Sequence, residues 1–238
     1  MSVEELLEGQ VLLLDKPLDW TSFQAVNKLK YKLKAEFRLK KLKIGHAGTL
    51  DPKATGLLIV CTGKATKQIS QIQDAAKTYQ VEIKIGVQTE SYDTEKPEIL
   101  PTDYSHVTAE NIREAVLSFQ GEIDQTPPVF SAIKIEGKRA YDLARQGKEV
   151  AMKSRKTTIH SITDLELSLP YVRFTVHCSK GTYIRSLAHD IGERLGIGAY
   201  LTALRRTRIG EYDVANAHSK YLESDFRFSN GDGENTHQ

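Results

Sequence analysis

Hydrophobic residues follow three different patterns along this chain of 238 residues, and each pattern predicts a different element. A continuous apolar run at residues 57–61 predicts a short strand that is buried on both faces. Strict alternation over residues 78–85 predicts a strand with one buried face. Apolar residues at helical spacing predict an amphipathic helix over residues 108–119 and another that begins at Gly181 and Thr182.

Several shorter signals complete the predicted order of elements. Thr21 and Gln24 have the spacing of a capping box, which predicts a helix after Thr21. Further strands are expected at residues 10–14, 129–135, 157–167 and 171–178, and further helices up to about Gln73 and around Tyr141. Strands and helices mix without strict β-α-β alternation, which favours an α+β fold over a doubly wound sheet.

The composition is that of a soluble globular protein, with 39% hydrophobic and 27% charged residues. The longest apolar run is too short to span a bilayer. The N-terminus is acidic and lacks the basic start and apolar core of a signal peptide, so a cytoplasmic location is expected. Cys61 and Cys178 lie in strand-like contexts without metal-ligand or redox spacing, and we interpret both as reduced core residues.

Charge is strongly segregated although the net charge is only +2. Residues 28–43 hold eight basic residues against Glu36 alone, and residues 134–156 hold eight against three acids. Residues 89–124 between them carry nine acids and two bases. Either basic segment alone is equally well explained as a solvated face. Together they favour a polyanionic partner such as nucleic acid.

One loop stands out as a candidate for chemistry, because residues 45–56 place Asp51 directly before Pro52 among three glycines. Glycine frees the backbone and proline stiffens it, so such a loop can hold a carboxylate at an unusual angle. Loops fixed on a rigid strand often carry catalytic groups. The alternative is a polar turn that leads into the buried strand at residues 57–61.

Three other side chains are candidate partners of Asp51. Tyr79 opens a predicted strand and offers an aromatic face for a base, although a packed strand tyrosine is the more common case. Arg185 lies at the margin of a helical stripe and could pair with a carboxylate or phosphate, although a surface salt bridge is the more common case. His46 is a weak candidate for acid–base chemistry or for insertion into nucleic acid.

Motifs for common cofactors are missing from the sequence. Gly56 and Gly63-Lys64 superficially suggest a phosphate-binding loop, but six residues separate the glycines and Ala65 replaces the required Ser or Thr. Neither a dinucleotide fingerprint, zinc spacing nor a serine nucleophile elbow is present. A reaction without cofactor or metal is therefore expected.

The longer motifs are similar to those of the TruB-type tRNA pseudouridine synthases of bacteria. The similarity is carried by residues 45–58, 63–67, 77–79, 126–134, 141–147, 177–185 and 204–207, and it extends from about residue 9 to residue 214. This resemblance implies the pseudouridine synthase fold: a mixed, largely antiparallel central sheet with flanking helices and a thumb-like insertion at about residues 124–152.

The resemblance also implies a reaction, the isomerisation of the T-loop uridine of tRNA (uridine-55) to pseudouridine after base flipping. Asp51 matches the family's nucleophile, which attacks either the sugar C1′ or the base C6. Tyr79 matches a stacking tyrosine, and Arg185 matches the arginine that pairs with the catalytic aspartate. The implied RNA-binding residues are His46, Lys64, Asp93, Lys134, Arg145, Lys180, Tyr183, Arg205 and Arg206.

The resemblance sets expectations for domains and partners as well. Residues 1–222 would form the catalytic domain, and residues 223–238 a disordered tail. Few residues follow Val214, so a C-terminal RNA-binding domain of the PUA type is not expected, and the basic residues 28–43 could compensate for it. Neutralising Lys40, Lys41 and Lys43 should then weaken tRNA binding and flatten its salt dependence. We expect a monomer that needs neither guide RNA, protein partner nor membrane.

Two other function classes stay open at this point. A tRNA-binding or tRNA-folding module with little turnover would have the same fold, although an intact set of Asp51, Tyr79 and Arg185 argues against binding alone. A glycoside hydrolase would use Asp51 with Asp93. The basic segments and the single tryptophan, Trp20, argue against that third possibility.

Overall fold

The structure is a computed structural model, and it describes residues 1–131, 134–135, 138–140, 151–223 and 225–228. The chain forms two compact units. The first comprises Met1–Ala75 and Arg206–Gln238, and the second comprises Ala76–Arg205. Strand β12 (Ala199–Ile209) contains the boundary, so its first residues belong to the second unit and its last residues to the first.

The first unit is built around a central strand, β3 (Ala54–Thr62), that pairs antiparallel with β1 (Val11–Lys16) and with β2 (Ile44–Ala47). Strand β13 (Tyr212–Asp213) pairs with the end of β12. The helices of this unit are α1 (Val3–Glu8), α2 (Ser22–Glu36), η1 (Gly63–Gln68), α3 (Ile69–Asp74), η2 (Val214–Asn216) and η3 (Ser219–Leu222).

The apolar run of β3 is buried on both faces, as its continuous pattern predicts. Leu58 and Val60 point into one core cluster, which also contains the buried side of α2. Leu57, Ile59 and Cys61 point into a second cluster on the opposite face, to which η1 and α3 contribute. Strand β3 is therefore a rigid base for the loop that precedes it.

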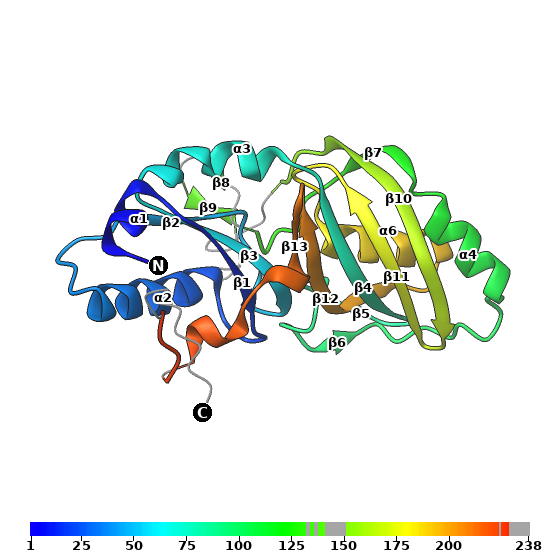
Figure 1. The fold of residues 1–238 in the computed structure, drawn as a ribbon. Coiled ribbons are helices and arrows are strands. Elements are labelled where there is room, and N and C mark those ends of the chain that lie inside the picture. The colour runs from blue at the N-terminus through cyan, green and yellow to red at the C-terminus, as the bar shows by residue number, and fades with distance from the viewer. Residues whose placement is uncertain (132–133, 136–137, 141–150, 224, 229–238) are drawn as a thin grey trace, which may run out of the picture. The chain divides into compact units, whose positions relative to one another are not determined.

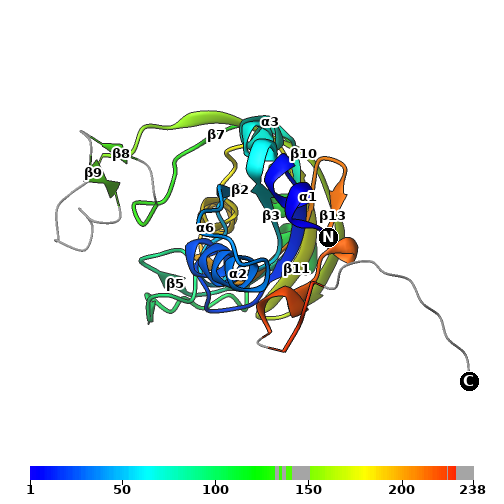
Figure 2. The same cartoon turned by 60° about the vertical axis from the view of Figure 1, so that its left-hand side comes forward.

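Helix α2 begins where the sequence predicts. Thr21 is the N-cap, its hydroxyl accepts from the Gln24 amide, and the Gln24 side chain accepts from the Thr21 amide. This capping box satisfies backbone groups that the first turn of a helix leaves without partners. The helix packs against β1, where Leu12 and Leu14 are buried (Figure 2).

The second unit holds a sheet in the order β12-β4-β11-β10-β7 (Figure 1). Its strands besides β12 are β4 (Lys77–Ile85), β7 (Gly121–Gln125), β10 (Arg155–Ser168) and β11 (Tyr171–Cys178), and the pairs β4–β11, β11–β10 and β10–β7 are antiparallel. Two small ladders join β5 (Gln88–Thr89) to β6 (Glu98–Ile99) and β8 (Lys134–Ile135) to β9 (Lys138–Arg139).

Two helices, α4 (Ala109–Leu117) and α6 (Ile184–Leu195), cover one face of this sheet (Figure 1). Alternate residues of β4 are buried, which confirms the period of two read from the sequence. Thr108 caps α4 with another capping box. Because these pairings are antiparallel and helices lie on one side, the expected α+β class with a largely antiparallel sheet is confirmed.

Several expectations differ from the structure in detail. The strand expected at residues 129–135 is wrong for residues 129–131, which form a bend, whereas Lys134–Ile135 is a paired strand. The helix expected around Tyr141 lies outside the described residues. Part of the segment expected to be disordered is packed, because Phe228 is buried beside Phe37, Tyr221 and Phe226. Both cysteines are buried and free, as expected.

Among the described residues, no helix combines the length and the apolar character that a membrane span requires.

Candidate active site

Asp51 lies in the loop between β2 and β3, two paired strands of the first unit. Two glycines of this segment have positive φ, +87° at Gly48 and +98° at Gly56. A Cβ atom at Gly56 would lie 2.3 Å from the carbonyl oxygen of Arg206. Glycine is therefore required there both by the backbone angle and by the close approach of β12.

The residues on both sides of Asp51 are anchored to the start of α2. The Ser22 hydroxyl donates to the carbonyl of Leu50 at 3.0 Å and accepts from the Leu50 amide at 2.8 Å. The Asp19 amide donates to the carbonyl of Pro52 at 2.9 Å. These bonds fix the backbone immediately before and after Asp51, whose own side chain is half-buried.

Arg206 holds the loop from β12. Its side chain is 2% exposed, and Nε donates to the carbonyl of Leu57 at 2.9 Å while Nη2 donates to that of Gly48 at 3.0 Å. These bonds to buried carbonyls support the loop from β12. A contact between Arg206 and RNA stays a prediction.

A second buried cation, Lys16, lies beside the loop at the end of β1. Its ammonium donates to the carbonyls of Trp20 at 2.6 Å and Pro17 at 2.8 Å, with the carbonyl of Pro52 at 3.5 Å. Burial lowers the pKa of Lys16 to about 8, and the negative charge of Asp51 opposes that shift. Lys16 thus brings positive charge to the neighbourhood of the Asp51 carboxylate.

His46 is half-buried in β2, five residues before Asp51. Burial lowers the pKa of His46, and the positive charge of Arg206 lowers it further. Both effects favour the neutral imidazole at neutral pH, in which one ring nitrogen accepts and the other donates.

The second unit contains a buried ion pair between Arg185, in the first turn of α6, and Asp93. The Arg185 Nε and the Asp93 Oδ2 are 3.7 Å apart, and the two side chains are 6% and 5% exposed. Arg185 Nη1 also donates to the carbonyl of Ser91 at 3.3 Å. The simple alternative for Arg185, a surface salt bridge, is therefore wrong.

Asp93 is held from several sides within its own loop. Its Oδ1 accepts from the Ser91 hydroxyl at 2.6 Å and from the Glu95 amide at 2.9 Å, and its carbonyl accepts from the Thr89 hydroxyl at 2.8 Å. A buried carboxylate with a cation and two donors is stably positioned. Asp93 is 3% exposed and is held against Arg185, and its role toward a substrate stays a prediction.

Tyr79 lies on the buried side of β4, with 9% of its surface exposed, opposite Val176 of β11. It belongs to the same unit as the Arg185–Asp93 pair.

The remaining RNA-binding candidates have varied surroundings. Lys64 is exposed and forms an ion pair with Glu8 at 2.8 Å, in which both side chains are about 70% exposed, so the pair contributes little to stability. Tyr183 is the N-cap residue of α6, and the guanidinium carbon of Arg155 lies 5.0 Å from its ring centroid. Lys180 is exposed and Arg205 is half-buried. Lys134 lies in β8, and Arg145 lies outside the described residues.

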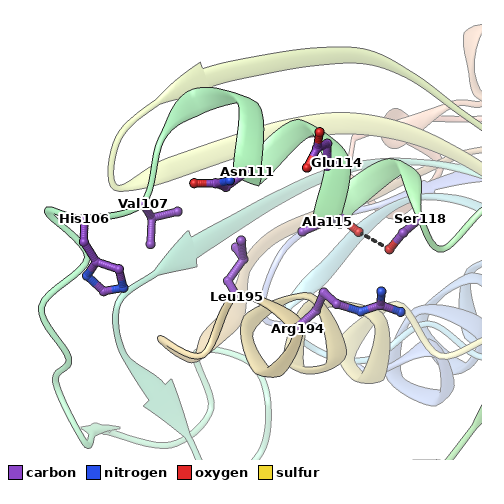
Figure 3. Close-up of a pocket in the computed structure, with 8 residues that line it drawn as sticks. All are labelled: His106, Val107, Asn111, Glu114, Ala115, Ser118, Arg194 and Leu195. Carbon is purple, nitrogen blue, oxygen red and sulfur yellow. Dashed lines mark hydrogen bonds between the residues drawn. The ribbon is translucent and has the colours of Figure 1, made fainter.

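A groove between α4 and the end of α6, with a volume of about 410 Å³, shares no residue with this site (Figure 3). It is lined by His106, Val107, Asn111, Glu114, Ala115, Ser118, Arg194 and Leu195. Within the described part of the chain, no group of three or more His, Cys, Asp and Glu side chains is arranged to hold a metal ion.

Sequence reasoning missed the residues that support the site. Neither Lys16 nor Ser22 is among the site residues that the sequence predicts. The signal that could have found Lys16 is a lysine at the end of an otherwise buried strand, since lysine is almost never fully buried without partners. Nothing local marks Ser22, because its partner Leu50 is 28 residues away.

Comparisons with known proteins match most of this chain. Residues 34–184 match the model of the TruB family pseudouridylate synthases (N-terminal domain), and residues 185–233 match that of the tRNA pseudouridylate synthase B C-terminal domain. The tRNA pseudouridine synthase B of Flavobacterium johnsoniae is 58% identical over 91% of this chain and 95% of its own length. The enzyme of the same name from Parabacteroides distasonis is 53% identical over 87% and 88%.

Solved structures show the same likeness. One chain in the crystal structure of a Cbf5-Nop10-Gar1 complex superposes with a TM-score of 0.64 at 32% identity. The match covers 88% of this chain and 52% of that chain, so this protein spans about half of its length.

Proposed function

The chain belongs to the TruB family of pseudouridylate synthases, and we propose that it isomerises the T-loop uridine of tRNA, uridine-55, with Asp51 as the nucleophile. In this reaction the N1–C1′ bond of the uridine breaks, the uracil turns, and a C5–C1′ bond forms. The hydrogen at C5 leaves as a proton and N1 gains a proton. The product is an isomer of the substrate, so the balance requires no oxidant or reductant.

The observation that carries this proposal is the way the Asp51 loop is built. Backbone groups of Leu50 and Pro52 are fixed on either side of Asp51 by bonds from the start of α2. A nucleophile held in position reacts without first losing conformational freedom, which is a large part of enzymatic rate enhancement. A simple polar turn would not need a buried arginine and a buried lysine to hold it.

Covalent attack by a carboxylate suits this reaction. It divides one bond exchange into two easier steps, and a carboxylate can be released again after the base has turned. The ammonium of Lys16 lies in the same loop region and attracts the Asp51 carboxylate. We propose that it keeps a compensating charge beside the nucleophile during both steps.

Tyr79 and Arg185 would bind and polarise the uridine after it has flipped out of the RNA stack. Flipping a base costs a few kcal/mol, and stacking on an aromatic ring returns roughly 1–3 kcal/mol per base. We assign this stacking role to Tyr79. Arg185, oriented by Asp93 in a buried pair, would supply a fixed positive charge to the reacting groups.

The test is release of tritium from a T-arm stem-loop that carries uridine labelled at C5, with purified protein and no guide RNA. We expect the wild type to release label and Asp51→Asn to lose turnover, because the amide is a poor nucleophile. Asp19→Asn, which changes an exposed carboxylate that pairs with Lys53 near the same loop, is the matched control and should stay active. A wild type without release rejects the synthase activity, whereas a fully active Asp51→Asn rejects only the assigned nucleophile.

A further inference from the structure

The surface of helix α2 is divided into three sides with different surroundings. Ala25, Val26, Leu29 and Leu33 form the buried side against β1 and β3. The C-terminal segment covers a second side, where the Lys32 ammonium donates to the carbonyl of Glu223 and lies 4.9 Å from the ring centroid of Phe226. Glu36, on that same side, accepts from the Phe228 amide.

The third side carries aromatic and basic residues. Phe23, Asn27, Lys30 and Lys34 are spaced by four, three and four residues, which places them in one row along a helix. Tyr31 borders this row. Phe23 is 70% exposed and Tyr31 is 71% exposed. We call this row together with Tyr31 the aromatic-basic flank.

The charged residues of α2 differ between these three sides of the helix. Glu36 is the single acidic residue of residues 28–43, and its carboxylate is turned to the C-terminal segment. The aromatic-basic flank therefore contains cations without an acidic neighbour from its own helix. Lysines alone are common on surfaces, but Lys30 and Lys34, which are half-buried, share this flank with two largely exposed rings. Basic residues combined with exposed aromatic rings suit unpaired RNA.

The flank is continuous with the candidate active site in the same unit. Phe23 follows Ser22, which bonds both the amide and the carbonyl of Leu50. Leu18, 53% exposed, lies on the neighbouring turn, whose Asp19 amide bonds to Pro52. The fifteen residues of α2 rise about 22 Å along its axis, so the flank leads away from Asp51 over a length of several nucleotides.

We propose that the aromatic-basic flank binds the RNA strand next to the target uridine. Phe23 and Tyr31 stack on unpaired bases, and Lys30 and Lys34 contact phosphates. This inference rests on the proposed function, since it takes Asp51 as the point where the uridine is held. It goes beyond that function by naming a second binding surface and the residues that form it.

Affinity for a fluorescent T-arm stem-loop at several salt concentrations tests this surface. Phe23→Ala and Tyr31→Ala should each weaken binding roughly five- to a hundredfold, the range of stacking energies. Lys30→Gln with Lys34→Gln should reduce the slope of log affinity against log salt by about 1.4, the value for two phosphate contacts of a single strand. Phe23→Tyr and Tyr31→Phe, which keep the rings, should restore affinity.

Lys32→Gln is the matched control, because it removes a lysine from the other side of the same helix. It should bind RNA as the wild type does, and thermal melting will show whether each variant is folded. Wild-type affinity in all flank variants would overturn the inference, as would an equal loss in Lys32→Gln. Tritium release by the wild type separates these outcomes from failure of the proposed function, because that release does not depend on which surface binds the RNA.

Discussion

The Ser22 hydroxyl and the Leu50 backbone form two hydrogen bonds with each other, one in each direction, at 3.0 and 2.8 Å. Both groups of Leu50 are thereby satisfied by one small side chain that is 2% exposed. The start of α2 and the residue before Asp51 are therefore held together by side-chain-to-backbone hydrogen bonds.

Ser22→Ala should cost stability and turnover together. It leaves the amide and carbonyl of Leu50 without a partner, which costs about 1–3 kcal/mol for each buried group. Urea unfolding and tritium release measure the two effects. Thr21→Ala is the control, since losing this N-cap costs about 1 kcal/mol of helix stability but removes no bond to the loop. If both variants lose turnover equally, Ser22 affects turnover only through the stability of α2 and not through its bonds to Leu50.

Arg206→Lys should destabilise the protein by about 2–4 kcal/mol, because an ammonium cannot replace a planar fork that reaches the carbonyls of Leu57 and Gly48. Turnover should fall with it, because the loop loses its support. The control is Arg208→Lys on the same strand, whose exposed side chain pairs with Asp213. A stable Arg206→Lys protein with reduced RNA affinity would instead indicate a contact with RNA.

The stability contributed by Lys16 should depend on pH in a defined direction. Its pKa is about 8 when folded, against 10.5 as the ordinary value, so between these pH values the unfolded chain binds more protons than the folded chain. Stability then rises with pH across this window. Wild type should gain about 2–3 kcal/mol relative to Lys16→Met between pH 7 and pH 10.5. Urea unfolding measures this difference in the free energy of unfolding. If the difference does not change with pH, burial does not lower the pKa of Lys16.

Asp93→Asn should destabilise the second unit strongly. The change leaves the Arg185 charge buried without its carboxylate, and breaking a buried pair costs about 3–5 kcal/mol. Glu122→Gln, which removes an exposed pair with Lys156, should cost less than about 1 kcal/mol. Urea unfolding of the two variants makes the comparison. Equal costs would mean that the Arg185–Asp93 pair is not structurally important.

The sequence predicts elements well where the pattern is local. The capping box at Thr21, the alternation in β4 and the continuous run in β3 each contain within a few residues the information that defines the element. Strand β2 was missed because four residues that include a glycine have no period, and only pairing with β3 makes them a strand.

The candidate site divides in the same way. Asp51 could be identified because glycines and a proline mark its loop in the sequence itself. The contacts of Lys16 and Arg206 with this loop could not be predicted, because the loop groups that they contact, Pro52 and Leu57, lie 36 and 149 residues away along the chain. From the sequence alone Arg206 resembles a phosphate ligand, because only the structure shows that its side chain is buried.

The contact between the C-terminal segment and α2 has a practical consequence for shortened versions of this protein. Composition suggests ending the chain after residue 222, but Phe228 is 7% exposed and packs beside Phe37 and Tyr221. Ending the chain there would expose the rings of Phe37 and Tyr221 and would remove the partners of Lys32 and Glu36. An exposed apolar patch of this kind promotes aggregation. A shortened version should therefore keep Phe228.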